Sequence, residues 1–174
     1  MDKFKKVFQG ELFTIKQGYL KSQNKTDLFY ETCQRPPAVG VLAIDNQKRI
    51  ILTREFRHHL GRTIWRIPLG GLEDNRRPDG AARQELLEEA GFKAGQFDLF
   101  YKSTAGSSVQ FIFYFYLARD LKHVGKDLEP DEHNRVHKVN LKRAHNLALK
   151  NGFHNENISY AIIRLWHERK KWLK

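Results

Sequence analysis

Apolar residues cluster in short runs along much of this chain, and these runs predict strands. Runs of this length that are rich in β-branched and aromatic residues favour extended chain. They cover residues 38–44, 49–54, 63–67, 97–102, 111–117 and 136–141. The first of them, from Ala38 to Ile44, is almost continuous, which is typical of a strand covered on both faces. The polar residues 45–48 after it predict a hairpin.

Three other segments show the helical repeat instead. Helices are expected at residues 80–90, 142–150 and 157–172. Asp79 is the candidate N-cap of the first helix, and Gly91 stands where a left-handed C-cap residue is expected. Strands, one helix, more strands and two helices follow one another in the chain. This order predicts an α+β or layered α/β/α domain.

The main break in this organisation comes early in the chain. Two strand-like pieces, at residues 12–15 and 28–30, precede Pro36 and Pro37, and the strongly apolar run follows these prolines. The length of 174 residues fits one domain with an extra arm. We therefore expect an N-terminal strand arm over residues 1–37 and a main domain over residues 38–174.

The composition argues against a membrane-spanning or secreted protein. The apolar runs are far shorter than the roughly 20 residues that cross a bilayer, so no transmembrane helix is expected. The charged N-terminus has no apolar block with a small-residue cleavage site, so no secretion signal is expected. The single cysteine, Cys33, cannot form an internal disulfide, and no Cys/His cluster has zinc spacing. These features favour a cytoplasmic location.

The net charge favours an anionic partner. The chain has 31 Lys and Arg against 20 Asp and Glu, a formal net charge of +11. Clustered cations attract the phosphates of nucleic acid, and a small phosphorylated ligand would use the same field. Part of the surplus lies in residues 167–174, for which a solvated helix tail is the simpler explanation.

The expected helix at residues 80–90 carries the candidate chemistry. At 100° per residue, Glu85, Glu88 and Glu89 share an arc of about 100°. The adjoining side is apolar and is expected to face the core; it holds Ala82, Leu86, Leu87 and Ala90. A divalent cation such as Mg²⁺ would relieve the repulsion between these carboxylates, because it prefers oxygen ligands together with substrate phosphates. Taken alone, however, such a pattern is more often solvated surface.

The residues before this helix favour a functional site over a solvated surface. Residues 70–92, GGLEDNRRPDGAARQELLEEAGF, resemble the box of the Nudix hydrolases, G-x5-E-x7-R-E-U-x-E-E-x-G-U, in which U is aliphatic or aromatic. The matching positions are Gly70, Glu85, Leu86, Glu88, Glu89, Gly91 and Phe92. Arg76 stands where the box has glutamate. Gln84 stands where it has an arginine that usually orients a neighbouring glutamate.

Other segments resemble the branch of this family that acts on ADP-ribose and nucleoside diphosphate sugars. They are residues 35–39, 54–58, 62–68, 115–121 and 129–132. The resemblance implies the Nudix fold, an α/β/α sandwich with a mixed sheet flanked by helices, in which residues 38–174 form the catalytic domain. Many ADP-ribose pyrophosphatases have S-P-G and an acidic residue where residues 103–110 have neither. This difference favours broader use of sugar nucleotides.

The implied reaction is Mg²⁺-dependent hydrolysis of the pyrophosphate bond in compounds such as ADP-ribose and GDP-mannose. The products are a nucleoside monophosphate and a sugar phosphate, and Mn²⁺ is an alternative ion. By the same resemblance, Glu85 and Glu89 are metal ligands, and Leu69 offers its backbone carbonyl. Glu88 is a further ligand or catalytic partner. Glu132 is the candidate that orients or deprotonates the attacking water, although neighbouring acidic residues could replace it and a solvated acidic loop explains it equally well.

The candidate substrate-binding residues are three arginines and one tyrosine. Arg54, Arg57 and Arg66 offer forked donors that match phosphate oxygens, although ordinary surface arginines are an equal alternative. Tyr30 in the arm could stack on a base, although packing is the simpler explanation for arm aromatics. In similar enzymes the arm pairs across a two-fold axis and helps to build the partner's nucleoside pocket. The resemblance therefore implies a homodimer.

Two alternatives remain, one from a different functional class and one a different enzymatic reaction. A Nudix domain that binds RNA or regulates without turnover would explain the positive charge together with Arg76 and Gln84. RNA cap hydrolysis is favoured by charge alone. Against the non-catalytic domain stand the three intact helix glutamates and the absence of an RNA-binding motif in the sequence. Nucleic acid is therefore a possible but not favoured partner.

Overall fold

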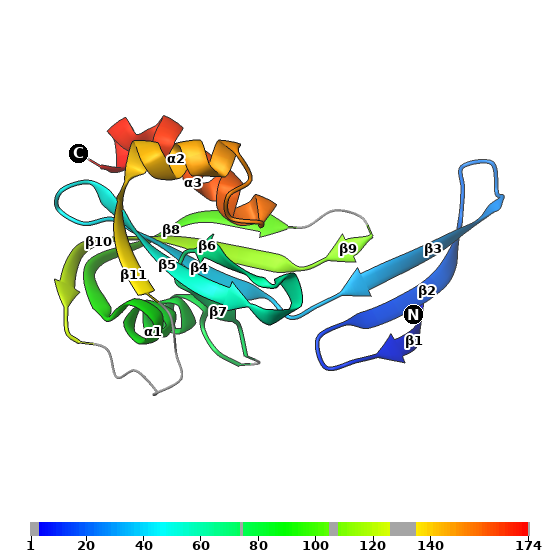
Figure 1. Ribbon diagram of the computed structural model, residues 1–174. Helices are drawn as coiled ribbons and strands as arrows, with labels where there is room; N and C mark the ends of the chain where they lie inside the picture. The colour runs from blue at the N-terminus through cyan, green and yellow to red at the C-terminus, as the bar shows by residue number, and fades with distance from the viewer. Residues whose placement is uncertain (1–3, 74, 105–107, 126–134, 174) are drawn as a thin grey trace.

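The computed structural model describes residues 4–73, 75–104, 108–125 and 135–173, which form three sheets and three α-helices (Figure 1). The helices are α1 (Pro78–Ala90), α2 (Leu141–Leu149) and α3 (Glu156–Trp172), and a 3₁₀ turn covers His58–Leu60. The strands are β1 (Phe4–Gln9), β2 (Thr14–Lys21), β3 (Asp27–Gln34), β4 (Ala38–Ala43), β5 (Arg49–Arg57), β6 (Arg62–Arg66), β7 (Leu69–Gly71), β8 (Phe92–Thr104), β9 (Val109–Gln110), β10 (Ile112–His123) and β11 (Arg135–Asn140). Each segment expected from the apolar pattern overlaps one of these elements. None of the helices in the described residues has the length and apolar character needed to cross a membrane.

A mixed four-stranded sheet lies at the centre of the main domain, in the order β7-β4-β10-β8. β4 runs parallel to β10 and antiparallel to β7, and β8 runs antiparallel to β10. A second, antiparallel sheet has the order β11-β5-β6. α1 covers one side of these strands and α2 and α3 cover the other (Figure 1). The expected α/β/α sandwich is therefore confirmed.

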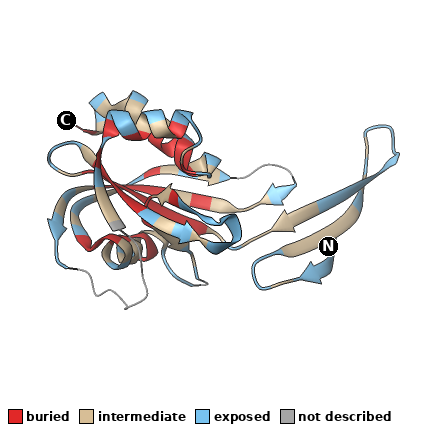
Figure 2. Cartoon of the chain, viewed as in Figure 1, coloured by how far each residue is buried: buried red, intermediate tan, exposed pale blue. Residues whose placement is uncertain are grey.

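β4 is buried on both faces, as its continuous apolar run predicted. Val39, Val41 and Ala43 belong to an apolar cluster that includes the buried residues of α1. Ala38 and Leu42 point the other way, because side chains alternate along a strand, and they join the cluster under α2 and α3. All residues of β4 are buried (Figure 2). One strand thus forms the wall between two cores.

Local sequence sets both ends of α1. Pro78 occupies the first turn, where its missing N–H removes no helical hydrogen bond, and the charge of Asp79 suits a helix N-terminus. Gly91 ends the helix with a left-handed φ of 74°, as expected. Two expectations are wrong. Arg77 rather than Asp79 is the N-cap, because the helix begins two residues earlier, and Leu87 is only half-buried because it lies at the margin of the apolar face.

Asp45 closes the hairpin between β4 and β5. Its Oδ1 accepts hydrogen bonds from the backbone N–H groups of Gln47 and Arg49, each at 2.9 Å. Its Oδ2 accepts one from Nε of Arg49 at 2.8 Å. Burial acts to raise the pKa of Asp45, but the hydrogen bonds from Arg49 and Gln47 outweigh it and lower the pKa below its ordinary value. The charged form of Asp45 therefore stabilises the fold.

Asp45→Asn should lower the free energy of unfolding by about 1–2 kcal/mol at neutral pH, because the amide oxygen can still accept from the two backbone N–H groups but the charge is lost and the amide NH2 cannot accept from Nε of Arg49. The folded-state pKa of Asp45 lies below the unfolded-state value of about 4. Its contribution is therefore complete above the unfolded-state pKa and is lost as the pH falls through the folded-state pKa. Urea unfolding of both proteins from pH 7 down to pH 2 measures this difference. A difference that stays constant over that range would contradict the prediction.

The N-terminal residues form the third sheet, which extends away from the sandwich as an arm (Figure 1). β1, β2 and β3 pair antiparallel, and β9 joins β3 through Cys33–Val109 and Gln34–Gln110. Figure 2 shows no buried residue on these three arm strands. Their large exposed apolar residues, with those of the turn after β1, are Val7, Phe8, Leu12, Phe13, Tyr19, Leu28, Phe29 and Tyr30. The arm therefore contributes little to the core of the chain.

Candidate active site

Glu85 and Glu89 of α1 both approach the short strand β7. The backbone N–H of Leu69 donates a hydrogen bond to Oε2 of Glu89 at 3.1 Å. Gly70 lies so close to Glu85 that a Cβ at this position would overlap the Glu85 carboxylate. Since β7 pairs with β4 and α1 packs on β4, the central sheet fixes this approach. A side chain at position 70 would therefore displace the Glu85 carboxylate from its place beside β7.

Arg66, at the end of β6, brings a positive charge to the same two carboxylates. Its side chain is only 11% exposed. Burial lowers the pKa of Arg66, and the nearby Glu89 and Glu85 oppose that shift; the guanidinium remains charged because its ordinary pKa is so high. Glu55 on β5 pairs with Arg66 and also with Nη2 of Arg57, the latter at 3.2 Å. Carboxylates and guanidiniums thus alternate from β5 to α1.

A cavity of about 450 Å³ opens beside these charges. Arg57, Arg66 and Leu69 line it, so it borders the groups that meet the α1 glutamates. The other lining residues are Leu12, Arg35, Ala38, His59, Leu60, Ile64, Phe111, Phe113, Phe153, His154, Asn155 and Ile158. Taken together, the described lining residues include three arginines and two histidines but no Asp or Glu. The size suits an organic ligand, and the lining favours an anionic one.

Arg35 also lines this cavity. In the sequence it stands out only as part of a segment that resembles the family. Its Cζ lies 4.9 Å from the centroid of the Phe111 ring, over the ring face. Its Nε is buried and has no hydrogen-bond partner among the described residues. A buried donor of this kind is costly unless water or a ligand satisfies it. Besides that segment, the sequence signal is that Pro36 and Pro37 follow directly and hold the chain extended ahead of β4.

Glu88 has different partners from Glu85 and Glu89. Nε2 of Gln84 donates a hydrogen bond to Oε1 of Glu88 at 2.6 Å, and Glu88 is exposed. Within the described part of the chain, no group of three or more His, Cys, Asp or Glu side chains is placed to hold a metal ion. The structure therefore brings Glu85 and Glu89 together near β7, and it places Glu88 on the outer side of the helix.

Two more residues expected at the site, Arg54 and Tyr30, lie elsewhere. Arg54 stacks over Trp65, with its Cζ 5.1 Å from the ring centroid, and it is absent from the cavity lining. Tyr30 lies on β3 of the arm, where its ring meets Phe4 edge-on at 6.5 Å between centroids. Glu132 lies outside the described residues. In this single chain, only Arg57 and Arg66 of the four predicted substrate-binding residues line the cavity.

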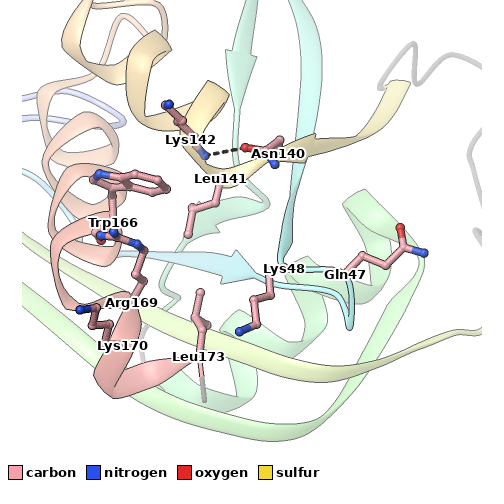
Figure 3. A pocket seen from close by; sticks show the side chains of 9 residues that line it. All are labelled: Gln47, Lys48, Asn140, Leu141, Lys142, Trp166, Arg169, Lys170 and Leu173. Carbon is pink, nitrogen blue, oxygen red and sulfur yellow. Dashed lines mark hydrogen bonds between the residues drawn. The ribbon is translucent and has the colours of Figure 1, made fainter.

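A second cavity, of about 440 Å³, lies between the β4–β5 turn, the start of α2 and the end of α3 (Figure 3). Arg169 stacks over Trp166, with its Cζ 4.0 Å from the ring centroid. The other lining residues are Gln47, Lys48, Asn140, Leu141, Lys142, Lys170 and Leu173. None of the predicted site residues is among them. Part of the surplus positive charge therefore gathers on this face, apart from the acidic helix.

Comparison with known proteins identifies the family. The family model for the NUDIX domain matches residues 34–160, which is well over half of the chain. The chain belongs to the Nudix family. The ADP-ribose pyrophosphatase of Bacillus subtilis (strain 168) is 30% identical over 161 residues, covering 90% of this chain and 86% of that protein. The methanol dehydrogenase activator of Bacillus methanolicus is 29% identical over 133 residues, covering 75% and 72% of the two chains.

The fold has a close counterpart among solved structures. The crystal structure of an ADP compounds hydrolase superposes with a TM-score of 0.79 at 22% identity, covering 96% of this chain and 92% of that chain. The resemblance of residues 70–92 to the Nudix box, and of the chain to the ADP-ribose pyrophosphatase branch, is thus confirmed. The protein is a Nudix hydrolase. Enzymes of this family generally use a divalent metal, and the carboxylate oxygens of α1 are ligands that such hard cations accept.

Proposed function

We propose that this Nudix hydrolase cleaves the pyrophosphate bond of nucleoside diphosphate sugars, ADP-ribose included, and releases a nucleoside monophosphate and a sugar phosphate. The main support for this proposal is that an acidic side chain of α1 and the arginine-lined cavity meet at β7. Glu89 is held there by the backbone N–H of Leu69, and an arginine-lined cavity begins at the same residue. Diphosphate hydrolysis needs both, because metal-binding carboxylates and phosphate-binding cations must reach one ligand.

We assign Mg²⁺ to the acidic helix, with Mn²⁺ as an alternative ion. Glu85 and Glu89 are the proposed ligands, Glu88 is a further ligand, and the backbone carbonyl of Leu69 completes the protein's contribution. Mg²⁺ fits such a set because it is commonly bound by a few carboxylates together with substrate phosphates. When bound, the ion neutralises charge on the diphosphate and helps to activate the attacking water.

Arginines of the cavity take the role of binding and orienting the diphosphate. Arg57 and Arg66 share Glu55, and this carboxylate restricts the orientation of both guanidiniums before a ligand arrives. Arg35 adds a third guanidinium, whose Nε has no partner among the described residues. Glu132, outside the described residues, stays our candidate for orienting or deprotonating the attacking water.

The substrate class draws support from one relative and from one missing motif. The relative that is 30% identical is named an ADP-ribose pyrophosphatase, which supports an ADP-linked substrate. The segment at residues 103–110 has no S-P-G, which supports acceptance of further sugar nucleotides. We therefore propose activity on ADP-ribose and on at least one other nucleoside diphosphate sugar.

A substrate panel tests this function directly. The purified chain is incubated with ADP-ribose, GDP-mannose, UDP-glucose, NADH, diadenosine polyphosphates, dNTPs and capped RNA, with Mg²⁺, with Mn²⁺ and with a chelator. Added phosphatase releases phosphate from monophosphate products but not from intact sugar nucleotides. We expect metal-dependent release from ADP-ribose and from at least one other sugar nucleotide. Sugar nucleotides that stay intact, whether or not dNTPs or capped RNA are cleaved, would disprove the proposal.

We also propose that the chain forms a homodimer through its arm. Large apolar side chains on β1, β2 and β3 are exposed in the single chain, and contiguous apolar surface of this kind marks interaction sites. Tyr19 and Phe29 meet edge-on across β2 and β3 at 5.4 Å, so they share one face of the arm. In such a dimer, Tyr30 would reach the nucleoside pocket of the partner rather than that of its own chain.

Phe29→Glu should convert the dimer to a monomer, because it places a charge within the apolar face of the arm. The chain mass is 20.5 kDa, so light scattering after size exclusion should give about 41 kDa (2 × 20.5) for the unmodified protein and about half of that for the variant. Gln23→Glu, at the exposed turn between β2 and β3, is the matched control and should stay dimeric. A monomeric unmodified protein at micromolar concentration would refute the dimer.

A further inference from the structure

Both departures from the Nudix box lie in contact with each other. Arg76 replaces a box glutamate and Gln84 replaces the box arginine. Nη2 of Arg76 donates a hydrogen bond to Oε1 of Gln84 at 2.6 Å, and Nε2 of Gln84 donates to Oε1 of Glu88 at 2.6 Å. A guanidinium can only donate and an ionised carboxylate can only accept. The amide of Gln84 between them therefore has a single orientation that satisfies both.

The loop before α1 fixes the position of Arg76. Its backbone N–H donates to the carbonyl of Glu73 at 3.2 Å, and Asn75 has a left-handed φ of 67°, which asparagine adopts more readily than most residues. The Glu73 carboxylate lies 3.8 Å from Nη1 of Arg76, so it approaches a different guanidinium nitrogen from the one that serves Gln84. Pro78 begins the helix directly afterwards. A tight turn thus brings the guanidinium to the outer side of α1.

We propose that Arg76 is a positioning residue that orients Glu88 through the amide of Gln84 and so replaces the charge missing at position 84. The inference rests on the proposed role of Glu88 at the metal site. Without Arg76, only the hydrogen bond to Glu88 holds the Gln84 amide, so the Gln84–Glu88 pair loses the anchor that fixes it against the loop. Partners of this kind, one step removed from a metal ligand, typically change metal affinity or activity by 10- to 100-fold.

The first test is independent of catalysis. The side-chain amide signals of Gln84 in a ¹H–¹⁵N spectrum are assigned by their loss in Gln84→Leu. We expect these signals to shift in Arg76→Met and to stay in place in Arg77→Met. Arg77 is a matched control, because it lies in the same loop, its side chain is 86% exposed and it pairs with Asp79. Unchanged Gln84 signals in Arg76→Met would disprove the contact.

The second test uses turnover of ADP-ribose at saturating Mg²⁺. Arg76→Met and Gln84→Leu should each lower kcat about 10-fold with KM changed less than about twofold, because neither residue touches the ligand cavity. The double variant should be no slower than the slower single variant, because both changes remove the same orientation. Losses that multiply in the double variant, or a change confined to KM, would overturn the proposal.

A third test asks whether an arginine at position 84 restores kcat in the Arg76→Met variant. Gln84→Arg in the Arg76→Met background places a guanidinium directly beside Glu88, so kcat should return to within about threefold of the unmodified protein. Gln84→Met in the same background, which fills similar space without charge, should stay slow. Failure of the arginine to rescue would refute the positioning role. If the unmodified protein cleaves no sugar nucleotide, the proposed function fails, whereas the amide signals still decide whether Arg76 orients Gln84.

Discussion

Glu89→Gln should reduce kcat for ADP-ribose by about 100- to 1,000-fold and leave the fold intact. The amide loses the charge with which Glu89 would hold a divalent ion beside Leu69. Metal ions supply several kcal/mol of charge stabilisation in the transition state, and each 1.4 kcal/mol is a factor of ten in rate. Steady-state kinetics at saturating Mg²⁺ measures the rate, and binding of Mn²⁺ followed by electron paramagnetic resonance measures the metal.

Asp79→Asn is the matched control for this experiment. It removes a carboxylate from the opposite end of the same helix, where Asp79 pairs with Arg77. We expect kcat to change less than about twofold and the thermal midpoint to fall slightly, because an acidic residue in the first turn contributes only about 0.3–1 kcal/mol. Turnover retained within about tenfold in Glu89→Gln would show that this carboxylate does not hold the catalytic ion.

Arg66→Met should lower kcat/KM by about 100-fold and also destabilise the fold by up to about 3 kcal/mol. Arg66 lines the cavity, so its loss would remove one of the donors proposed to bind phosphate. It also faces Glu85 and Glu89 and pairs with Glu55, so its loss leaves these carboxylates with less compensation. Enzyme kinetics with ADP-ribose gives the first effect, and urea unfolding gives the second.

Adding Glu55→Gln separates the two effects of the Arg66 change. The double variant Arg66→Met/Glu55→Gln should recover part of the stability, because it neutralises the carboxylate that lost one of its two arginine partners, but it should recover no activity. Arg54→Met is the companion variant, since Arg54 stacks on Trp65 outside the cavity, and its kcat/KM should fall less than about threefold. Equal losses in Arg54→Met and Arg66→Met would contradict the arrangement of the arginines described above.

The acidic helix could be found from the sequence because all of its determinants are local. Helical spacing alone places Glu85, Glu88 and Glu89 on one side of a short helix, and Gly91 marks its end. Gly70 lies fifteen residues before Glu85 in the same family-like segment. A pattern within 23 residues therefore predicts the helix, whereas the approach of the helix to β7 depends on β4, with which β7 pairs and on which α1 packs.

The ligand cavity could not be predicted in the same way, because its residues come from distant segments. Arg35 precedes β4, Arg66 ends β6, Phe111 precedes β10, and His154 follows α2. Only the tertiary fold brings such positions together. The pairing of β3 with β9 could not be predicted from the sequence either, because a strand of two residues is too short to show an alternating apolar pattern.

The arginines of β5 show how an error in strand length misplaces a site residue. The apolar run predicted a strand that ends at Arg54, whereas β5 continues to Arg57. A strand that extends through both residues turns them to opposite faces, because they are an odd number of residues apart. Arg57 therefore reaches Glu55 and the cavity, and Arg54 reaches Trp65 instead. β1 was not predicted from the sequence, because its residues, FKKVFQ, contain no continuous apolar run and are mostly exposed.

The burial of β4 on both sides has a consequence for how the molecule opens. A strand that two cores share cannot be released by loosening either layer of helices alone, so its amide hydrogens should exchange with solvent only through global unfolding. Thermal fluctuations that lift α1 or α2 would leave the register between β4 and β7 unchanged. The backbone of β7, which Glu85 and Glu89 approach, should therefore be rigid because it pairs with β4, although the two glutamates themselves are only partly buried.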